Sequence, residues 1–94
     1  MNVHLKFFLP SLPGAIGKTE LDIDFDGKTV NDLIEHLVNV YGNEARKALY
    51  DDQDNLDPMI QILRNGEEWI THDQLGTPLD DGDELIFMLI MAGG

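Results

Sequence analysis

The sequence predicts an α+β fold in which one mixed sheet of four to five strands curls around a main helix. Apolar residues occupy every second position over residues 3–9 and 21–25, as they do in half-buried strands. Apolar residues recur at helical spacing over residues 30–41. Residues 85–92 are all apolar, which is typical of a short strand buried on both faces and is too short to span a membrane.

The first two predicted strands form a hairpin with a long connection. Residues 10–18 separate them and contain two prolines and two glycines, which favour a loop. In the second strand, Asp22 and Asp24 alternate with Leu21 and Ile23, so one face of this strand is acidic and wet.

The main helix has clear signals at both ends. Thr29 is a favoured N-cap with Asp32 three residues later, and Gly42 occupies the position where helices commonly end. One apolar stripe should face the sheet: Val30, Leu33, Ile34, Leu37, Val38 and Tyr41. We expect Leu33 and Leu37 to be buried together with two residues of the last strand, Leu85 and Phe87.

The middle of the chain supplies smaller elements. The sequence predicts, in order, a short helix at 43–50, an acidic loop at 51–58, a strand at 59–63, a turn at 65–66, a short strand at 68–71, and a loop or single helical turn at 72–83. The element order is then β-β-α-β-β-β. Because a strand buried on both faces belongs at the centre of a sheet, we expect the first and last strands to pair in its middle.

Charge excludes several classes of partner. The chain carries 18 acidic and 6 basic residues, a net charge of −12. It should be repelled by nucleic acid and by anionic membranes, and attracted to basic protein surfaces. There is no cysteine, so disulfides and thiolate chemistry are excluded. We expect a cytoplasmic protein folded as one domain over residues 1–94.

Motifs that could carry metal or phosphate chemistry fail on spacing. Residues 22–27 match the first half of a calcium loop, but Leu33 stands where the loop needs a bidentate glutamate. Gly-Lys-Thr occurs at 17–19 and at 27–29, each time without the earlier glycine of a phosphate-binding loop. Three histidines share no metal-ligand spacing: His4, His36 and His72. We therefore expect no metal site.

The last strand contains a candidate docking surface. If Leu85, Phe87 and Leu89 face the helix, the alternate residues emerge on the opposite face beside Phe8. An apolar patch with an acidic rim is typical of a protein docking surface, and a covering loop is the alternative. Both interpretations stay open from the sequence. The predicted partner-binding residues are Phe8, Ile86, Met88, Ile90 and Ala92.

The end of the printed sequence carries the strongest functional signal. Gly93 and Gly94 have no side chains to pack and lose much backbone entropy on ordering, so we expect a flexible tail with a free carboxylate. The Asp-Gly-Asp-Glu of residues 81–84, the apolar strand and the final Ala92-Gly93-Gly94 resemble the ThiS/MoaD family of ubiquitin-like sulfur carriers. The predicted element order is similar to the β-grasp fold of that family, so the resemblance covers the whole chain.

The resemblance implies a function for the tail. In that family an E1-like enzyme uses ATP and Mg²⁺ to adenylate the C-terminal carboxylate, which then becomes a thiocarboxylate that donates sulfur in cofactor biosynthesis. It implies that Gly94 is the reacting acyl group and that Gly93 leads to it. It also implies that the chain is a carrier with no bound cofactor and no activity by itself. The implied partners are the E1-like enzyme and a sulfur-accepting synthase subunit.

Two functions and two pathways stay open. The alternative to a sulfur carrier is a ubiquitin-like modifier that is joined to lysines of target proteins through Gly94. We favour the carrier because no residues follow Gly94 that would need processing. Residues 89–91 lack the prolines common in molybdopterin-synthase small subunits and are closer to the thiamine type. Chain length and residues 43–58 instead resemble the molybdopterin type, toward which the sequence leans.

Overall fold

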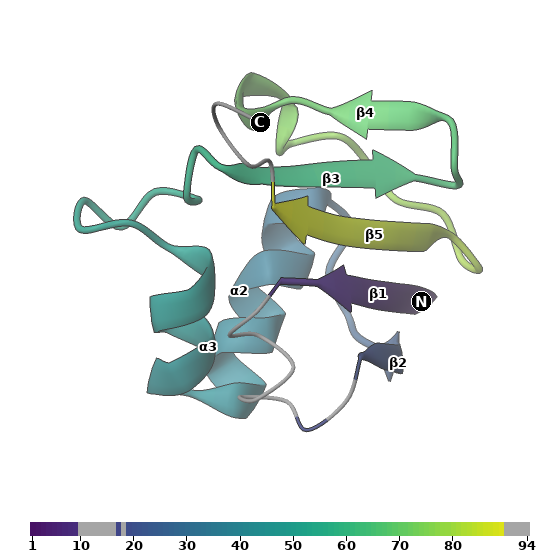
Figure 1. Cartoon of the computed structure of the whole chain (residues 1–94). Coiled ribbons are helices and arrows are strands. Elements are labelled where there is room, and N and C mark those ends of the chain that lie inside the picture. The colour runs from purple at the N-terminus through teal and green to yellow at the C-terminus, as the bar shows by residue number, and fades with distance from the viewer. Residues whose placement is uncertain (10–16, 18, 90–94) are drawn as a thin grey trace.

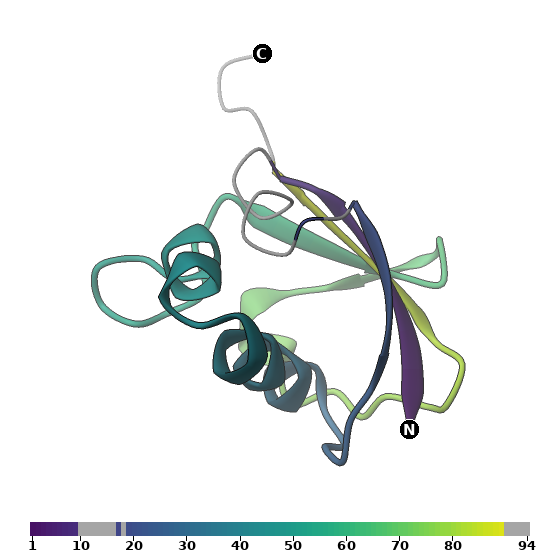
Figure 2. The ribbon, with the colours of Figure 1, turned by 90° about the horizontal axis from the view of Figure 1, so that it is seen from below.

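The computed structural model describes residues 1–9, 17 and 19–89. Within these residues one mixed sheet has the strand order β2-β1-β5-β3-β4. Figures 1 and 2 show helices α2 and α3 on the same face of this sheet. The elements are β1 (Asn2–Phe8), β2 (Glu20–Asp24), α2 (Val30–Tyr41), α3 (Asn43–Leu49), β3 (Ile60–Arg64), β4 (Glu68–Ile70), the 3-10 turn η1 (His72–Gln74) and β5 (Glu84–Leu89).

The first and last strands pair in the middle of the sheet, as the sequence predicts. β1 runs parallel to β5, and its other neighbour, β2, is antiparallel. Phe7 stands opposite Phe87 in this pair, and their ring centroids are 5.7 Å apart. β5 lies between β1 and β3 and is therefore hydrogen-bonded along both edges.

Helix α2 begins and ends where its capping residues predict. The Thr29 hydroxyl accepts the Asp32 N–H at 3.1 Å, and the Asp32 carboxylate accepts the Thr29 N–H at 3.1 Å, which together form a capping box. Gly42 follows the helix with a φ of 74°, a conformation that favours glycine. These contacts fix the start and the end of the helix that covers the sheet.

The core lies between the helices and the inner face of the sheet. Leu33 and Leu37 of α2 and Leu85 and Phe87 of β5 are all fully buried in one cluster, as expected. Helix α3 extends the cover with two buried side chains, Ala45 and Leu49. The short helix predicted at 43–50 is thus confirmed as part of the core.

The outer face of β5 differs from the prediction that this strand is buried on both faces. Leu85 and Phe87 are buried, but Ile86 and Met88 are only half-buried. The reason is that both helices pack on the inner face (Figure 2). The described strand begins at Glu84 and ends at Leu89, and the expected residues 90–92 lie outside the described part of the chain. None of the helices that the structure describes is long and apolar enough to cross a membrane.

Candidate docking face and tail

Apolar side chains gather on the face of the sheet that points away from the helices. Phe8 stands opposite Met88, and Met88 is paired in turn with Gln61 of β3. Ile86 is paired with Leu63, and Leu63 with Trp69 of β4. Because cross-strand partners point to the same face, these side chains form one surface. We call it the apolar patch: Phe8, Leu63, Trp69, Ile86 and Met88.

Exposure makes the apolar patch available for binding. The side chain of Phe8 is 63% exposed and that of Trp69 is 52% exposed, whereas Ile86, Met88 and Leu63 are half-buried. Large apolar groups at such exposure, gathered on one face, are typical of a protein interaction site. The structure therefore brings together three of the sequence-predicted partner-binding residues, and it places no loop of the described chain over Phe8 or Trp69. Their role in binding stays a prediction.

Trp69 and Leu63 belong to this surface but were not predicted to lie in it. β4 contains only three residues, so its sequence gives little alternation from which to assign a face. The register between β3 and β4 places Trp69 on the outer face of the sheet, because it pairs Trp69 with Leu63. The Asn65-Gly66 turn between these strands is the signal that could have fixed that register from the sequence.

An acidic strand borders the apolar patch on one side. Glu20 and Asp22 of β2 point to the same face as His4 of β1 and are bound to it: Nδ1 of His4 lies 2.7 Å from Asp22 Oδ1, and Nε2 lies 3.1 Å from Glu20 Oε1. Ionised carboxylates only accept hydrogen bonds, so only the protonated imidazole can donate to both at once, and these contacts favour that form. Hydrogen bonds to Asp22 and then to Glu20 raise the pKa of His4 above its ordinary value.

The border between acid and apolar surface is marked by a cavity of about 220 Å³. It is lined by Lys6, Phe8, Thr19 and Glu20. Lys6 Nζ lies 3.7 Å from Glu84 Oε2, so its charge is already matched on this face. A partner that covers Phe8 would therefore meet a predominantly negative flank on the β2 side, which favours a basic partner surface.

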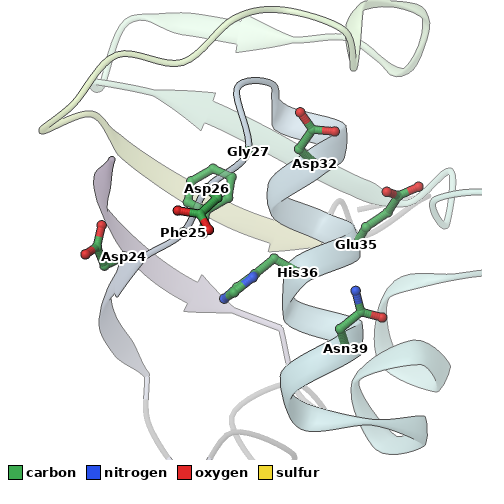
Figure 3. Close-up of a pocket in the computed structure, with 8 residues that line it drawn as sticks. All are labelled: Asp24, Phe25, Asp26, Gly27, Asp32, Glu35, His36 and Asn39. Carbon is green, nitrogen blue, oxygen red and sulfur yellow. The ribbon is translucent and has the colours of Figure 1, made fainter.

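A larger cavity, of about 440 Å³, lies on the other side of β2 near the start of α2 (Figure 3). The Asp32 carboxylate there is already occupied by the backbone N–H groups of Lys28 and Thr29. His36 packs on Phe25 with ring centroids 5.7 Å apart. The described residues contain no cluster of three or more ligating side chains that could hold a metal ion. The cavity is lined by Asp24, Phe25, Asp26, Gly27, Asp32, Glu35, His36 and Asn39.

The predicted tail begins where the described residues end. The predicted site residues Ile90, Ala92, Gly93 and Gly94 lie outside the described residues. β5 ends at Leu89, five residues before Gly94, and five extended residues span at most about 18 Å. Position 94 therefore lies within about 18 Å of the end of β5.

Comparisons with known proteins place the chain in a family. The sequence model described as the ThiS family matches residues 13–94. A putative sulfur carrier protein of Archaeoglobus fulgidus is 36% identical over 83 residues, which is 88% of this chain and 93% of that protein. Small archaeal modifier protein 3 of Haloferax volcanii is 30% identical over 96 residues and covers 100% of both chains.

The fold agrees with a solved structure as well. The crystal structure of SAMP1, a small archaeal modifier protein from Haloferax volcanii, has a TM-score of 0.79 to this chain at 29% identity, with 100% of both chains covered. This similarity confirms the predicted ubiquitin-like β-grasp fold. Together with the sequence match through residue 94, it shows that the chain belongs to the ThiS family of ubiquitin-like sulfur carriers and modifiers.

Proposed function

We propose that this chain is a sulfur carrier whose reactive group is the carboxylate of Gly94. The observation that carries the proposal is that the family match runs through Gly94 and that a 36%-identical relative is named as a putative sulfur carrier protein. The chain would act as a cosubstrate in cofactor biosynthesis of the molybdopterin or thiamine type. Its chemistry would be supplied by partner enzymes.

The proposed chemistry begins with activation of a poor electrophile. The Gly94 carboxylate attacks the α-phosphorus of ATP, held with Mg²⁺ on an E1-like enzyme, and pyrophosphate leaves. In the acyl-adenylate that forms, AMP is a good leaving group. A hydrosulfide-equivalent nucleophile supplied by a partner then attacks the acyl carbon and displaces AMP, which leaves a thiocarboxylate. A synthase subunit would accept its sulfur.

Two glycines suit the end of such a carrier. Because Gly93 and Gly94 have no Cβ, they form a thread that can enter a narrow active site and take conformations closed to other residues. The same freedom is costly on binding, because each ordered residue loses backbone entropy. The tail therefore supplies the reacting group, and affinity has to come from a folded surface.

The apolar patch and its acidic flank supply that surface in this proposal. Phe8 and Trp69 are large, exposed aromatic side chains, which are the kind of group that dominates binding energy in protein interfaces. The carboxylates of Glu20 and Asp22 would raise the association rate with a basic enzyme surface. The predicted contacts with Ile90 and Ala92 would continue this interface toward the tail.

A second function is favoured by a separate observation. A relative named small archaeal modifier protein 3 aligns over its entire length at 30% identity. A modifier and a sulfur carrier share the adenylation step and differ in the nucleophile that attacks the acyl-adenylate. A lysine amine gives an isopeptide bond through Gly94, whereas a sulfur nucleophile gives the thiocarboxylate.

Removal of Gly94 tests the activation step. We expect the truncated chain to lose ATP–pyrophosphate exchange with the cognate E1-like enzyme, because its carboxylate no longer reaches the nucleotide. The melting temperature should be nearly unchanged, since Gly94 has no side chain that could pack in the core. Exchange at the parent rate in the truncated protein would overturn the proposal.

A further inference from the structure

The apolar run that forms β5 carries little information about its own register. Leu85 and Phe87 face the core and Ile86 and Met88 face the apolar patch, yet all four are large and apolar. When a strand slips by one residue against its neighbours, its apolar side chains normally move to solvent, which is unfavourable. Here a slip would still place apolar residues on both faces. Some other feature must therefore fix the register.

The residue just before β5 is tied to several parts of the sheet. Asp83 is only 7% exposed, and its Oδ2 accepts hydrogen bonds from Arg64 Nε at 2.9 Å and from the Asp80 N–H at 2.8 Å. Its Oδ1 accepts one from Asn65 Nδ2 at 3.0 Å. Its backbone carbonyl accepts the His4 N–H at 2.9 Å. β1, β3 and the β3–β4 turn thus all converge on Asp83.

Arg64 is held as firmly as its partner. Its side chain is 14% exposed, and its guanidinium lies within ion-pair distance of three carboxylates: Asp83 at 2.7 Å, Asp80 at 3.2 Å and Glu68 at 3.3 Å. Burial alone would raise the pKa of Asp83, but hydrogen bonds from the Asp80 N–H, Asn65 and Arg64 outweigh it and lower that pKa. A slip of β5 would take the buried Asp83 carboxylate away from Arg64 and Asn65, which is strongly unfavourable, whereas Arg64 would keep Glu68.

The next residue is anchored by the same turn. The Glu84 N–H donates to Asn65 Oδ1 at 2.9 Å, and the Asn65 N–H donates to the Glu84 carbonyl at 2.8 Å. Asn65 therefore binds two consecutive residues at the beginning of β5. Any residue offers the backbone groups of Glu84, but the contacts of Asp83 need a carboxylate. A two-residue slip in one direction brings Leu85 to this position, which has none. A slip in the other direction brings Asp81 there, but the residue three positions before it is Pro78, which has no N–H to replace that of Asp80.

We infer that Asp83, through its contacts with Arg64 and Asn65, is a positioning residue that sets the register of β5 and with it the reach of the Gly94 carboxylate. The second half of this inference rests on the proposed function. A slip by two residues preserves the faces of β5 but moves the tail along the strand by about 7 Å. Displacement of a reacting group by even a small distance reduces its reaction strongly.

Cross-strand disulfides read the register directly, because the chain has no cysteine of its own. Gln61 and Met88 are paired across β3 and β5, so a Gln61→Cys/Met88→Cys pair reports the observed register. A two-residue slip in either direction instead pairs position 61 with 86 or position 63 with 88. Gln61→Cys/Ile86→Cys and Leu63→Cys/Met88→Cys therefore report the two slipped registers.

The background variant is Arg64→Met/Asp83→Ala, which removes both charges and leaves neither one buried alone. The matched control is Asp81→Ala in the same turn, whose exposed carboxylate accepts the Asn2 N–H. We expect the control to form the 61–88 disulfide as the parent does. We expect the double variant to form several-fold more disulfide in one of the slipped pairs.

A folded double variant that forms only the 61–88 disulfide, with the yield of the control, would overturn the inference. Side-chain packing would then set the register. If the double variant does not fold, Asp83→Asn replaces it as the background, because asparagine keeps the shape of the side chain. The inference is again wrong if this variant forms only the 61–88 disulfide. The readout needs no activating enzyme, so a failure of the proposed function would leave the register result standing. A slipped variant that is adenylated at the parent rate would reject the link to the tail.

Discussion

Phe8 and Met88 stand directly opposite each other in the parallel pair of β1 and β5, on the face of the sheet that the helices leave uncovered. Phe8 is the most exposed large apolar residue of the described chain. Met88 lies between it and Gln61, at the centre of the five-stranded sheet. A partner that covers the centre of this face would therefore contact Met88.

Replacing Met88 with aspartate should weaken binding to the E1-like enzyme about tenfold or more. Burial of a methionine contributes roughly 1.5–3 kcal/mol, and about 1.4 kcal/mol corresponds to a factor of ten. Val40→Asp is the matched control, because Val40 is 56% exposed on helix α2, away from the sheet face. Calorimetric titration measures both. Equal affinities for the two folded variants would reject the apolar patch as the docking site.

Trp69 should report docking by its fluorescence. It is the only tryptophan of the chain and lies in the apolar patch, 52% exposed. Covering its indole removes water, so we expect a blue-shifted emission maximum on addition of a tryptophan-free E1-like enzyme. Trp69→Phe should keep the fold and lose the signal. An emission spectrum that stays unchanged while calorimetry shows binding would place the interface elsewhere.

Leu37→Ala should cost about 2–5 kcal/mol of folding free energy, the usual range for truncating a buried leucine. Leu37 is fully buried between α2 and the sheet. Val40→Ala on the same helix should change stability by less than about 0.5 kcal/mol, since Val40 is exposed. Urea unfolding measures both. A loss below about 1 kcal/mol for Leu37→Ala would mean that the helix does not pack as described.

His4 should make stability depend on pH. Its pKa is raised in the folded chain, first by the hydrogen bond to Asp22 and then by that to Glu20. Its contribution is therefore full below the unfolded-state pKa of about 6.5 and is lost as pH rises through the higher folded-state pKa. NMR titration of the His4 ring should give a pKa above 6.5. Asp22→Asn should lower it, and an unaltered His4 pKa in that variant would contradict the assigned cause.

Much of this fold could be predicted because the signals are local. Thr29 and Gly42 mark the ends of α2 by capping chemistry, and the stripe that includes Leu33 and Leu37 repeats at helical spacing. The exposed face of β5 could not be predicted in the same way. An unbroken apolar run has no alternation that would show which side is open to solvent.

The parts that could not be predicted depend on strand register. Asp83 lies in an acidic turn, and only the pairing of β3 with β5 brings Arg64 beside it. His4 meets Glu20 and Asp22 for the same reason, through the pairing of β1 with β2. Spacing in the sequence does not show that these side chains meet, since the partners are 16 to 19 residues apart.

The intact mass of this protein, recovered from its own cells, tests the central claim most directly. A sulfur carrier should be found with one oxygen of the Gly94 carboxylate replaced by sulfur, and alkylation specific for thiocarboxylates should shift that species alone. Treatment with the E1-like enzyme, ATP and a sulfide source should convert the acid form to the same mass. If Gly94 is found only as the free acid and in isopeptide bonds to lysine, and the treated protein gains no sulfur, the sulfur-carrier account is wrong.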